Sequence, residues 1–132
     1  MPRNVVQIIF SSTSGVLLAF RQNTEVLDKL WAFPSGRIEP GELPLQAAIR
    51  ESIEELAVEP NDLTFLGELI DPIFRITHYF YLCRNWTGKI INAEPHLCRE
   101  VCWFDITSFP IDCTPTTYMI LPKLKRYLLS NK

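Results

Sequence analysis

Three glutamates stand within one helical turn near the middle of the chain, at Glu51, Glu54 and Glu55. At positions i, i+3 and i+4 of a helix their side chains are neighbours, and like charges at this spacing repel each other. A divalent cation would turn that repulsion into chelation, because hard cations such as Mg²⁺ take oxygen ligands. The spacing therefore indicates a metal site, and the alternative is an acidic helix face that is simply solvated.

A helix that begins at about Leu43 or Pro44 would carry these glutamates. Pro44 suits the first helical turn, where its missing N–H is not needed. Four apolar residues at helical spacing predict the face that packs on the core, with the glutamates on the other side. These residues are Leu45, Ile49, Ile53 and Leu56.

The residues before and within this helix stand at the spacings of the Nudix box, the pattern G-x5-E-x7-R-E-U-x-E-E-x-G-U, in which U is aliphatic. The matching residues are Gly36, Glu42, Arg50, Glu51, Glu54, Glu55 and Val58. The sequence therefore resembles the Nudix hydrolases over residues 36–58. The segment LWAFPSGRIEPGE, which overlaps the start of the box, is similar to the MutT branch of that family.

Two positions depart from the pattern. Ser52 stands where an aliphatic residue is usual, and it is small enough to bond back to a helix carbonyl at a half-buried place. Ala57 replaces the second glycine at the helix end. There it either takes a left-handed conformation, at a cost of about 1 kcal/mol, or lets the helix continue until Glu59-Pro60.

Apolar runs bounded by turn residues predict the other elements. Strands are expected over residues 5–10, 15–21, 30–33, 63–74 with an interruption near Asp71-Pro72, 77–84 and 100–105. Loops or turns are expected over 11–14, 22–29, 34–42, 85–88, 89–98 and 107–117. A second helix is expected over about 117–129, despite Pro122, with Ile120, Leu124 and Leu128 turned inward.

This order of elements predicts an α/β fold. The resemblance implies the Nudix form of it, an α/β/α sandwich with a mixed β-sheet between helices. Residues 1–132 would form a single Nudix hydrolase domain with its box at 36–58. The length and the hydrophobic fraction of 47% are sufficient for the core of one such domain.

The resemblance also implies a metal site and a base. Mg²⁺ or Mn²⁺ would be held by Glu51, Glu54 and Glu55 together with the backbone carbonyl of Ser35. Glu51 and Glu54 are the expected catalytic carboxylates, and Arg50 would orient them through salt bridges. The proton acceptor is either Glu54 or a glutamate from the loop after residue 88. For that loop glutamate, or for an additional metal ligand, the candidates are Glu94 and Glu100.

Substrate contacts are expected from six residues. The side chain of Arg21, at the end of a strand, suits a phosphate because its guanidinium fork is fixed, and Arg37 lies in the box loop. Trp31 and Phe33 either stack on the base or pack in the core. Thr116 and Thr117 stand where purine-specific relatives carry acidic residues that read the base, so a different base or a permissive pocket is expected.

The reaction that the resemblance implies is hydrolysis of a nucleoside diphosphate linked to another group. The first expectation is a nucleoside or deoxynucleoside triphosphate, damaged or non-standard nucleotides included, cleaved to the monophosphate and pyrophosphate. Alternative substrates are ADP-ribose, a dinucleoside polyphosphate or a capped RNA end. A third alternative is a nucleotide-sensing domain without catalysis, against which the complete set of glutamates argues.

Charge and hydropathy limit the partners. A net charge of −2 gives no footprint for a nucleic-acid polymer, and fits a small phosphorylated substrate held through metal ions. No apolar run approaches the roughly 18–20 residues of a membrane span, and the run over residues 5–10 is too short for a signal peptide. We expect a cytoplasmic protein, either monomer or homodimer. The cysteines include no C-x-x-C pair, so we expect no disulfide.

Overall fold

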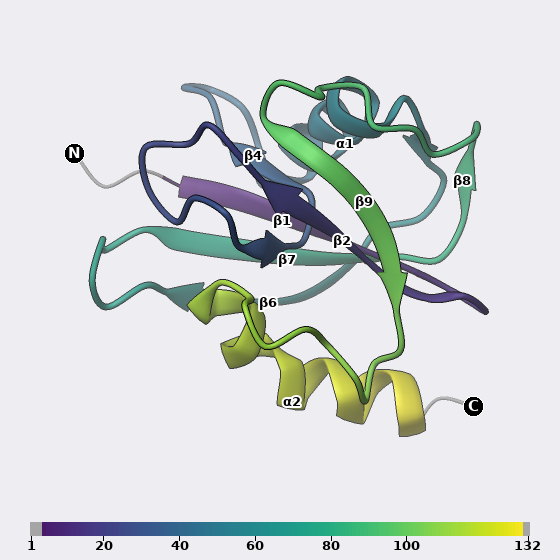
Figure 1. Cartoon of the computed structure of the whole chain (residues 1–132). Helices are drawn as coiled ribbons and strands as arrows, with labels where there is room; N and C mark the ends of the chain where they lie inside the picture. The colour runs from purple at the N-terminus through teal and green to yellow at the C-terminus, as the bar shows by residue number, and fades with distance from the viewer. Residues whose placement is uncertain (1–3, 131–132) are drawn as a thin grey trace.

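The structure of the protein is a computed structural model, in which residues 4–130 are described. A seven-stranded mixed sheet lies between two helices, α1 (Pro44–Leu56) and α2 (Pro115–Ser130) (Figure 1). The strands of this sheet are β1 (Asn4–Ser12), β2 (Gly15–Arg21), β3 (Trp31–Ala32), β4 (Ser35–Arg37), β6 (Thr64–Ile70), β7 (Thr77–Cys83) and β9 (Cys98–Phe104). The predicted α/β/α sandwich with a mixed sheet is confirmed.

The strand order is β3-β2-β1-β7-β6, with β4 paired to β1 and β9 paired to β2. Only β1 and β7 pair in parallel, and the remaining pairs in this sheet are antiparallel. A separate two-stranded sheet joins β5 (Glu59–Pro60) to β8 (Trp86–Thr87). Within the described range, no helix is both apolar enough and long enough to cross a membrane.

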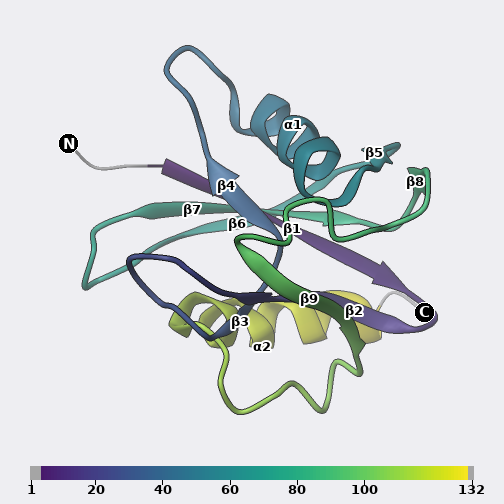
Figure 2. The same ribbon diagram turned by 45° about the horizontal axis from the view of Figure 1, so that its top comes forward.

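The strands β1 and β2 stay paired only beside their connecting turn. Their register includes Ser11 opposite Val16 and Ser12 opposite Gly15, and the two strands separate beyond these pairs. From there β1 continues with β4 and β7, while β2 continues with β3 and β9. Figure 2 shows the two strands meeting at the hairpin and diverging away from it. The sheet is therefore split into two halves joined at one end.

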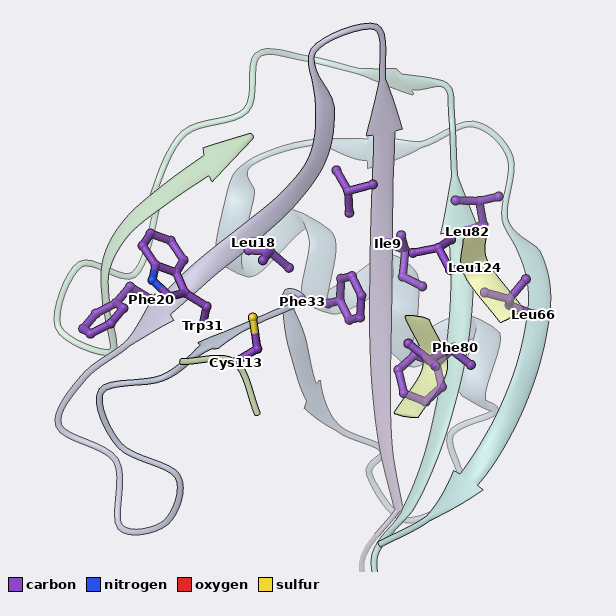
Figure 3. Close-up of a cluster of buried hydrophobic side chains, with 12 residues drawn as sticks. Ile9, Leu18, Phe20, Trp31, Phe33, Leu66, Phe80, Leu82, Cys113 and Leu124 are labelled. Atoms are coloured by element: carbon purple, nitrogen blue, oxygen red, sulfur yellow. The ribbon is translucent and has the colours of Figure 1, made fainter. Parts of the chain in front are cut away.

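Alternating side chains along the strands build one core on each face of the sheet. On β1, Ile9 joins the cluster beside α2, whereas Val6, Ile8 and Phe10 join the cluster beside α1. Figure 3 shows the cluster on the α2 side, where Trp31 lies beside Phe20. The residues Ile120 and Leu124 of α2 are buried there, with Leu128 packed against the cluster, which confirms the predicted inner face of this helix.

The predicted inner face of α1 is wrong. Leu45 and Ile53 are 44% and 49% exposed, and Ile49 is half-buried. The buried residues of this helix are Ala47, Ala48, Ser52 and Leu56. The helix packs against β1 and β4, and small side chains leave room for this close approach. Of the four predicted core residues, only Leu56 belongs to the inner face.

The two departures from the box pattern are accommodated locally. The Ser52 hydroxyl donates a hydrogen bond to the carbonyl of Ala48 at 2.7 Å, which satisfies it in a fully buried place. Ala57 ends α1 in the left-handed region, with φ 60° and ψ 33°, and its N–H donates to the carbonyl of Ile53. The helix therefore stops at Leu56, and an alanine takes the conformation usually left to glycine.

Four further predictions need correction. Residues 35–37 form β4 where a loop was expected, because the backbone of this segment pairs with β1. Residues 86–87 form β8 within an expected turn, paired to β5. The strand expected over 63–74 ends at Ile70, because a carboxylate oxygen of Asp71 accepts hydrogen bonds from the N–H groups of Ile73 and Phe74 and closes a turn. The helix α2 begins at Pro115, two residues early.

Candidate active site

The split between the two half-sheets opens into a cavity of about 370 Å³. One half-sheet lines it with residues of β1, β4 and β7, and the other with residues of β2, β3 and β9. The C-terminal end of α1 reaches the cavity through Glu55, and the start of α2 reaches it through Thr116. Cavities of this size are typical of small-molecule sites. The divergence of β1 and β2 thus creates the site.

Arg50 holds together three carboxylates of the box, Glu42, Glu51 and Glu54, which are not among the residues that line this cavity. Its Nε and Nη2 donate to the two carboxylate oxygens of Glu42 at 2.8 and 2.9 Å. Its Nη1 lies 2.8 Å from Glu51 Oε1 and 3.2 Å from Glu54 Oε2. A further bond from Nη2, at 2.9 Å, goes to the backbone carbonyl of Arg37 in β4. Every part of the guanidinium fork is used, so its position is fixed by the box residues themselves.

Glu42 is the most strongly bound carboxylate of the set. Its hydrogen bonds from Arg50 are the main cause of a pKa lowered to about 2, and the backbone N–H of Glu39 adds a further hydrogen bond at 3.0 Å. The residue lies in the loop that leads into α1. Its ion pair with Arg50 therefore ties the loop to the helix.

Gly36 makes room for Glu51. A Cβ built on Gly36 would overlap the carboxyl group of Glu51, so only glycine leaves that carboxyl group in its place. Burial raises the pKa of Glu51, the contacts with Arg50 oppose the rise, and the charges of Glu54 and Glu94 add to it. The position of the Glu51 carboxyl group therefore requires glycine at residue 36, the first glycine of the box.

Glu55 is half-buried, and its Oε2 is enclosed without a hydrogen-bond partner in the described part of the chain. Burial raises its pKa well above the ordinary value, and the negative charges of Glu51 and Glu94 act in the same direction. A hydrogen bond from the backbone of Ser35 and the charge of Arg21 oppose the rise. A carboxylate in this setting needs a positive charge to remain ionised.

The donor set fits a hard cation by its chemistry. The negative charges that act on Glu55 are the carboxylates of Glu51 and Glu94, and Mg²⁺ and Mn²⁺ accept carboxylate oxygens as ligands. Among residues 4–130, no three acidic, histidine or cysteine side chains converge into a complete metal cluster. Glu51 and Glu54 do not converge with Glu55 because Arg50 binds one carboxylate oxygen of each. A Mg²⁺ site commonly uses one or two carboxylates and completes its shell with water and substrate phosphates.

Arg21 lines the cavity from the end of β2. Its Nε donates to the carbonyl of Leu27 at 2.9 Å, and its Nη2 donates to that of Val26 at 3.2 Å. Burial lowers its pKa, while the negative charges of Glu55 and Asp28 raise it. The guanidinium is thus presented beside Glu55, supported by the loop that follows its own strand.

The other predicted site residues divide into two groups. Phe33, Arg37, Ser35, Glu94 and Thr116 line the cavity. Trp31, Thr117 and Glu100 are not among its lining residues. The ring of Trp31 is buried in edge contacts with Phe20 and Phe104, and Thr117 is buried with its hydroxyl on Thr114. Glu100 is exposed and accepts a hydrogen bond from the thiol of Cys102. Of the two aromatic candidates, only Phe33 faces the cavity.

The lining also includes Gln7 of β1 and His78 of β7, two polar residues that the sequence analysis did not assign to the site. Both side chains are buried, and they are hydrogen-bonded to each other. The sequence does contain an indication of Gln7, because it is a polar residue inside the apolar run VVQIIF. A buried polar residue in a strand needs a partner from elsewhere in the fold, and one sequence does not identify that partner.

Comparisons with known proteins agree with this fold. Residues 1–124 match the NUDIX domain. The chain is 29% identical over 125 residues to the 8-oxo-dGTP diphosphatase of Escherichia coli (strain K12), a match that covers 92% of this chain and 94% of that protein. It is 32% identical over 112 residues to the m7GpppN-mRNA hydrolase dcap-2 of Caenorhabditis elegans, covering 79% of this chain and 13% of that one.

Among solved structures, the chain resembles a MutT NUDIX hydrolase from Burkholderia pseudomallei. The TM-score is 0.85 and the identity 23%, and the match covers 94% of this chain and 98% of that chain. The chain belongs to the NUDIX domain family, as its box residues predict. Within that family it is a Nudix hydrolase of the MutT-like kind.

Proposed function

We propose that this chain, acting as one domain in the cytoplasm, hydrolyses nucleoside or deoxynucleoside triphosphates to the monophosphate and pyrophosphate. Damaged or non-standard nucleotides are included among the substrates, as befits a housecleaning enzyme. The observation that carries the proposal is the position of Glu55 and Arg21 at one cavity. Glu55, which has one buried carboxylate oxygen without a hydrogen-bond partner among the described residues, and the guanidinium of Arg21 both line it, which suits a metal-bound phosphate chain.

The cation expected is Mg²⁺ or Mn²⁺, held by Glu51, Glu54 and Glu55 with the carbonyl of Ser35. When bound, such an ion neutralises phosphate charge and lowers the pKa of an attacking water. Arg50 keeps Glu51 and Glu54 oriented, and Arg21 binds a phosphate oxygen. One glutamate, Glu54 or Glu94, accepts the proton from the water that attacks phosphorus. The bond between phosphorus and the bridging oxygen breaks, and the two phosphate products leave.

The test is the release of pyrophosphate from a panel of common and oxidised nucleoside triphosphates, with and without Mg²⁺. ADP-ribose, a dinucleoside polyphosphate and a capped RNA complete the panel. The variant Glu54→Gln should lose about 100-fold or more in kcat, since a positioned base contributes at least that much. Glu59→Gln is the matched control, because this exposed glutamate lies in β5, whereas Glu54 belongs to the carboxylates that Arg50 binds. Absence of turnover on every substrate would favour a nucleotide sensor.

A further inference from the structure

A polar group of three side chains lies where β1, β7 and α2 meet at the cavity. The Nε2 of Gln7 is 2.9 Å from Nδ1 of His78, and it donates to the hydroxyl of Thr116 at 3.1 Å. All three residues line the cavity, although Gln7 is only 3% exposed and His78 only 8%. This group is distinct from Glu55, the box carboxylate among the lining residues, since no residue of α1 takes part in it.

Two atoms of this group lack a partner. In the described part of the chain, neither Oε1 of Gln7 nor Nε2 of His78 accepts or donates a hydrogen bond. A buried polar atom without a partner costs about 1–3 kcal/mol, and native proteins keep few of them. Two such atoms on hydrogen-bonded neighbours, both belonging to residues of one cavity lining, point to a ligand that supplies both partners.

The shared hydrogen bond couples the polarity of the two unpaired atoms. If the Gln7 amide donates to Nδ1 of a neutral His78, the free atoms are an accepting Oε1 and a donating Nε2–H. If the amide is turned over, it accepts from Nδ1–H, and the free atoms become a donating NH₂ and an accepting Nε2. Each arrangement offers one donor and one acceptor, and the change from one to the other reverses both at once.

Burial keeps His78 in the neutral form that this coupling needs, because it lowers the pKa of the imidazole. The negative charge of Asp71 opposes this effect, but one oxygen of that carboxylate is already engaged by the backbone N–H groups of Ile73 and Phe74. Gln7 and Thr116, the other groups bonded here, carry no charge.

We propose that Gln7 and His78 bind the edge of the nucleobase, and that their coupled polarity lets the site accept both amino and keto bases. The inference rests on the proposed function and names the part of the substrate that this group reads. Adenine offers a donor at its 6-position beside a ring acceptor, whereas guanine offers an acceptor there beside a ring donor. The two bases can therefore bind in one orientation, each with one of the two arrangements.

The kinetic test compares ATP, GTP, CTP and UTP with the wild-type protein, Gln7→Met and His78→Phe. We expect the wild-type kcat/KM values to lie within about 10-fold of one another. Each variant should raise KM by about 10-fold or more for all four, since one hydrogen-bonded base atom is left unpaired, with a much smaller change in kcat. The inhibition constant of inorganic tripolyphosphate, which has no base, should keep its wild-type value. His96→Phe serves as the control, because the backbone of this exposed residue bonds the Asn23 side chain but its ring is outside the cavity lining.

A second measurement reads the tautomer directly, because the chain has only two histidines. In the His96→Gln protein, the ring ¹⁵N resonances of His78 should report opposite neutral tautomers with the Mg²⁺ complexes of the α,β-imido analogues of ATP and GTP. The proposal would be overturned if the spectrum did not change at saturation, or if both analogues gave the same tautomer. It would also be overturned if the kcat/KM for one base exceeded the others by more than about 100-fold. An equal loss of tripolyphosphate binding in the folded variants would overturn it as well. If no nucleotide is hydrolysed, the proposed function fails, and the spectra still decide whether the base contacts His78.

Discussion

Gly36 and Glu51 are in such close contact that no side chain larger than hydrogen fits between β4 and the Glu51 carboxyl group. We expect Gly36→Ala to displace this carboxyl group and to lower kcat/KM by about 100-fold or more, as small displacements in an active site do. Circular dichroism should still report a folded protein. Gly41→Ala is the control, since a Cβ there meets no atom within 4 Å although the positive φ strains it. Equal activity of the two variants would contradict the steric role of Gly36.

The raised pKa of Glu55 predicts a pH-dependent stability. Because the folded protein holds this proton more tightly than the unfolded chain, the contribution of Glu55 is favourable below its ordinary pKa and is lost as pH rises through the folded pKa. Without metal, Glu55→Gln should therefore unfold at a higher temperature than the wild type at pH 8. The difference should vanish near pH 4.

Addition of Mg²⁺ should reverse this order. A ligand that binds only the folded state stabilises it by about 2.7 kcal/mol at a hundredfold excess over its Kd. The wild type should gain stability from Mg²⁺, and Glu55→Gln should gain much less, in thermal unfolding monitored at pH 8. A metal response of equal size in both proteins would remove Glu55 from the set of metal ligands.

The ion pair of Glu42 and Arg50 predicts a different dependence at acid pH. The pKa of Glu42 is lowered to about 2, so its stabilising effect is present above the ordinary carboxyl pKa of 4.5 and is lost as pH falls toward 2. Glu42→Gln should lower the unfolding temperature at pH 6, and the loss should shrink between pH 4.5 and 2. Differential scanning calorimetry across this range would check it. A constant difference between the two proteins would mean that the ion pair is not its cause.

The two faces of α1 should respond differently to truncation. Leu56→Ala should lower the free energy of unfolding by about 2–5 kcal/mol, because this side chain is only 2% exposed. Ile53→Ala should change it by less than about 1 kcal/mol, since the side chain is half exposed and alanine favours a helix. Urea unfolding of both variants measures the difference. Equal losses of unfolding free energy in the two variants would show that Ile53 is a core residue.

The end of the same helix offers a stabilising change. Ala57 has a φ of 60°, where a side chain is strained and glycine is not. Ala57→Gly should raise the free energy of unfolding by about 1 kcal/mol. Ala48→Gly in the buried interior of α1 is the opposite case and should lower it by about 1 kcal/mol or more. Urea unfolding again provides the measurement, and destabilisation by Ala57→Gly would contradict the strain.

The predictable part of this protein is the part encoded by local spacing. The box residues, most of the strands and the inner face of α2 follow from period and motif alone. The inner face of α1 did not, because the decision between Ile53 and Ala48 depends on how near β1 and β4 come to the helix. The pairing of Gln7 with His78 was also hidden, because it joins residues 71 positions apart through the strand order.

The one-ended junction of β1 and β2 has a mechanical consequence. Gln7 stands on one half-sheet and Arg21 on the other. A nucleotide that touches both would connect the two half-sheets at the end where β1 and β2 are not hydrogen-bonded to each other. Substrate would then stiffen the open end of the protein, and amide hydrogen exchange along β2 and β4 should slow in its presence.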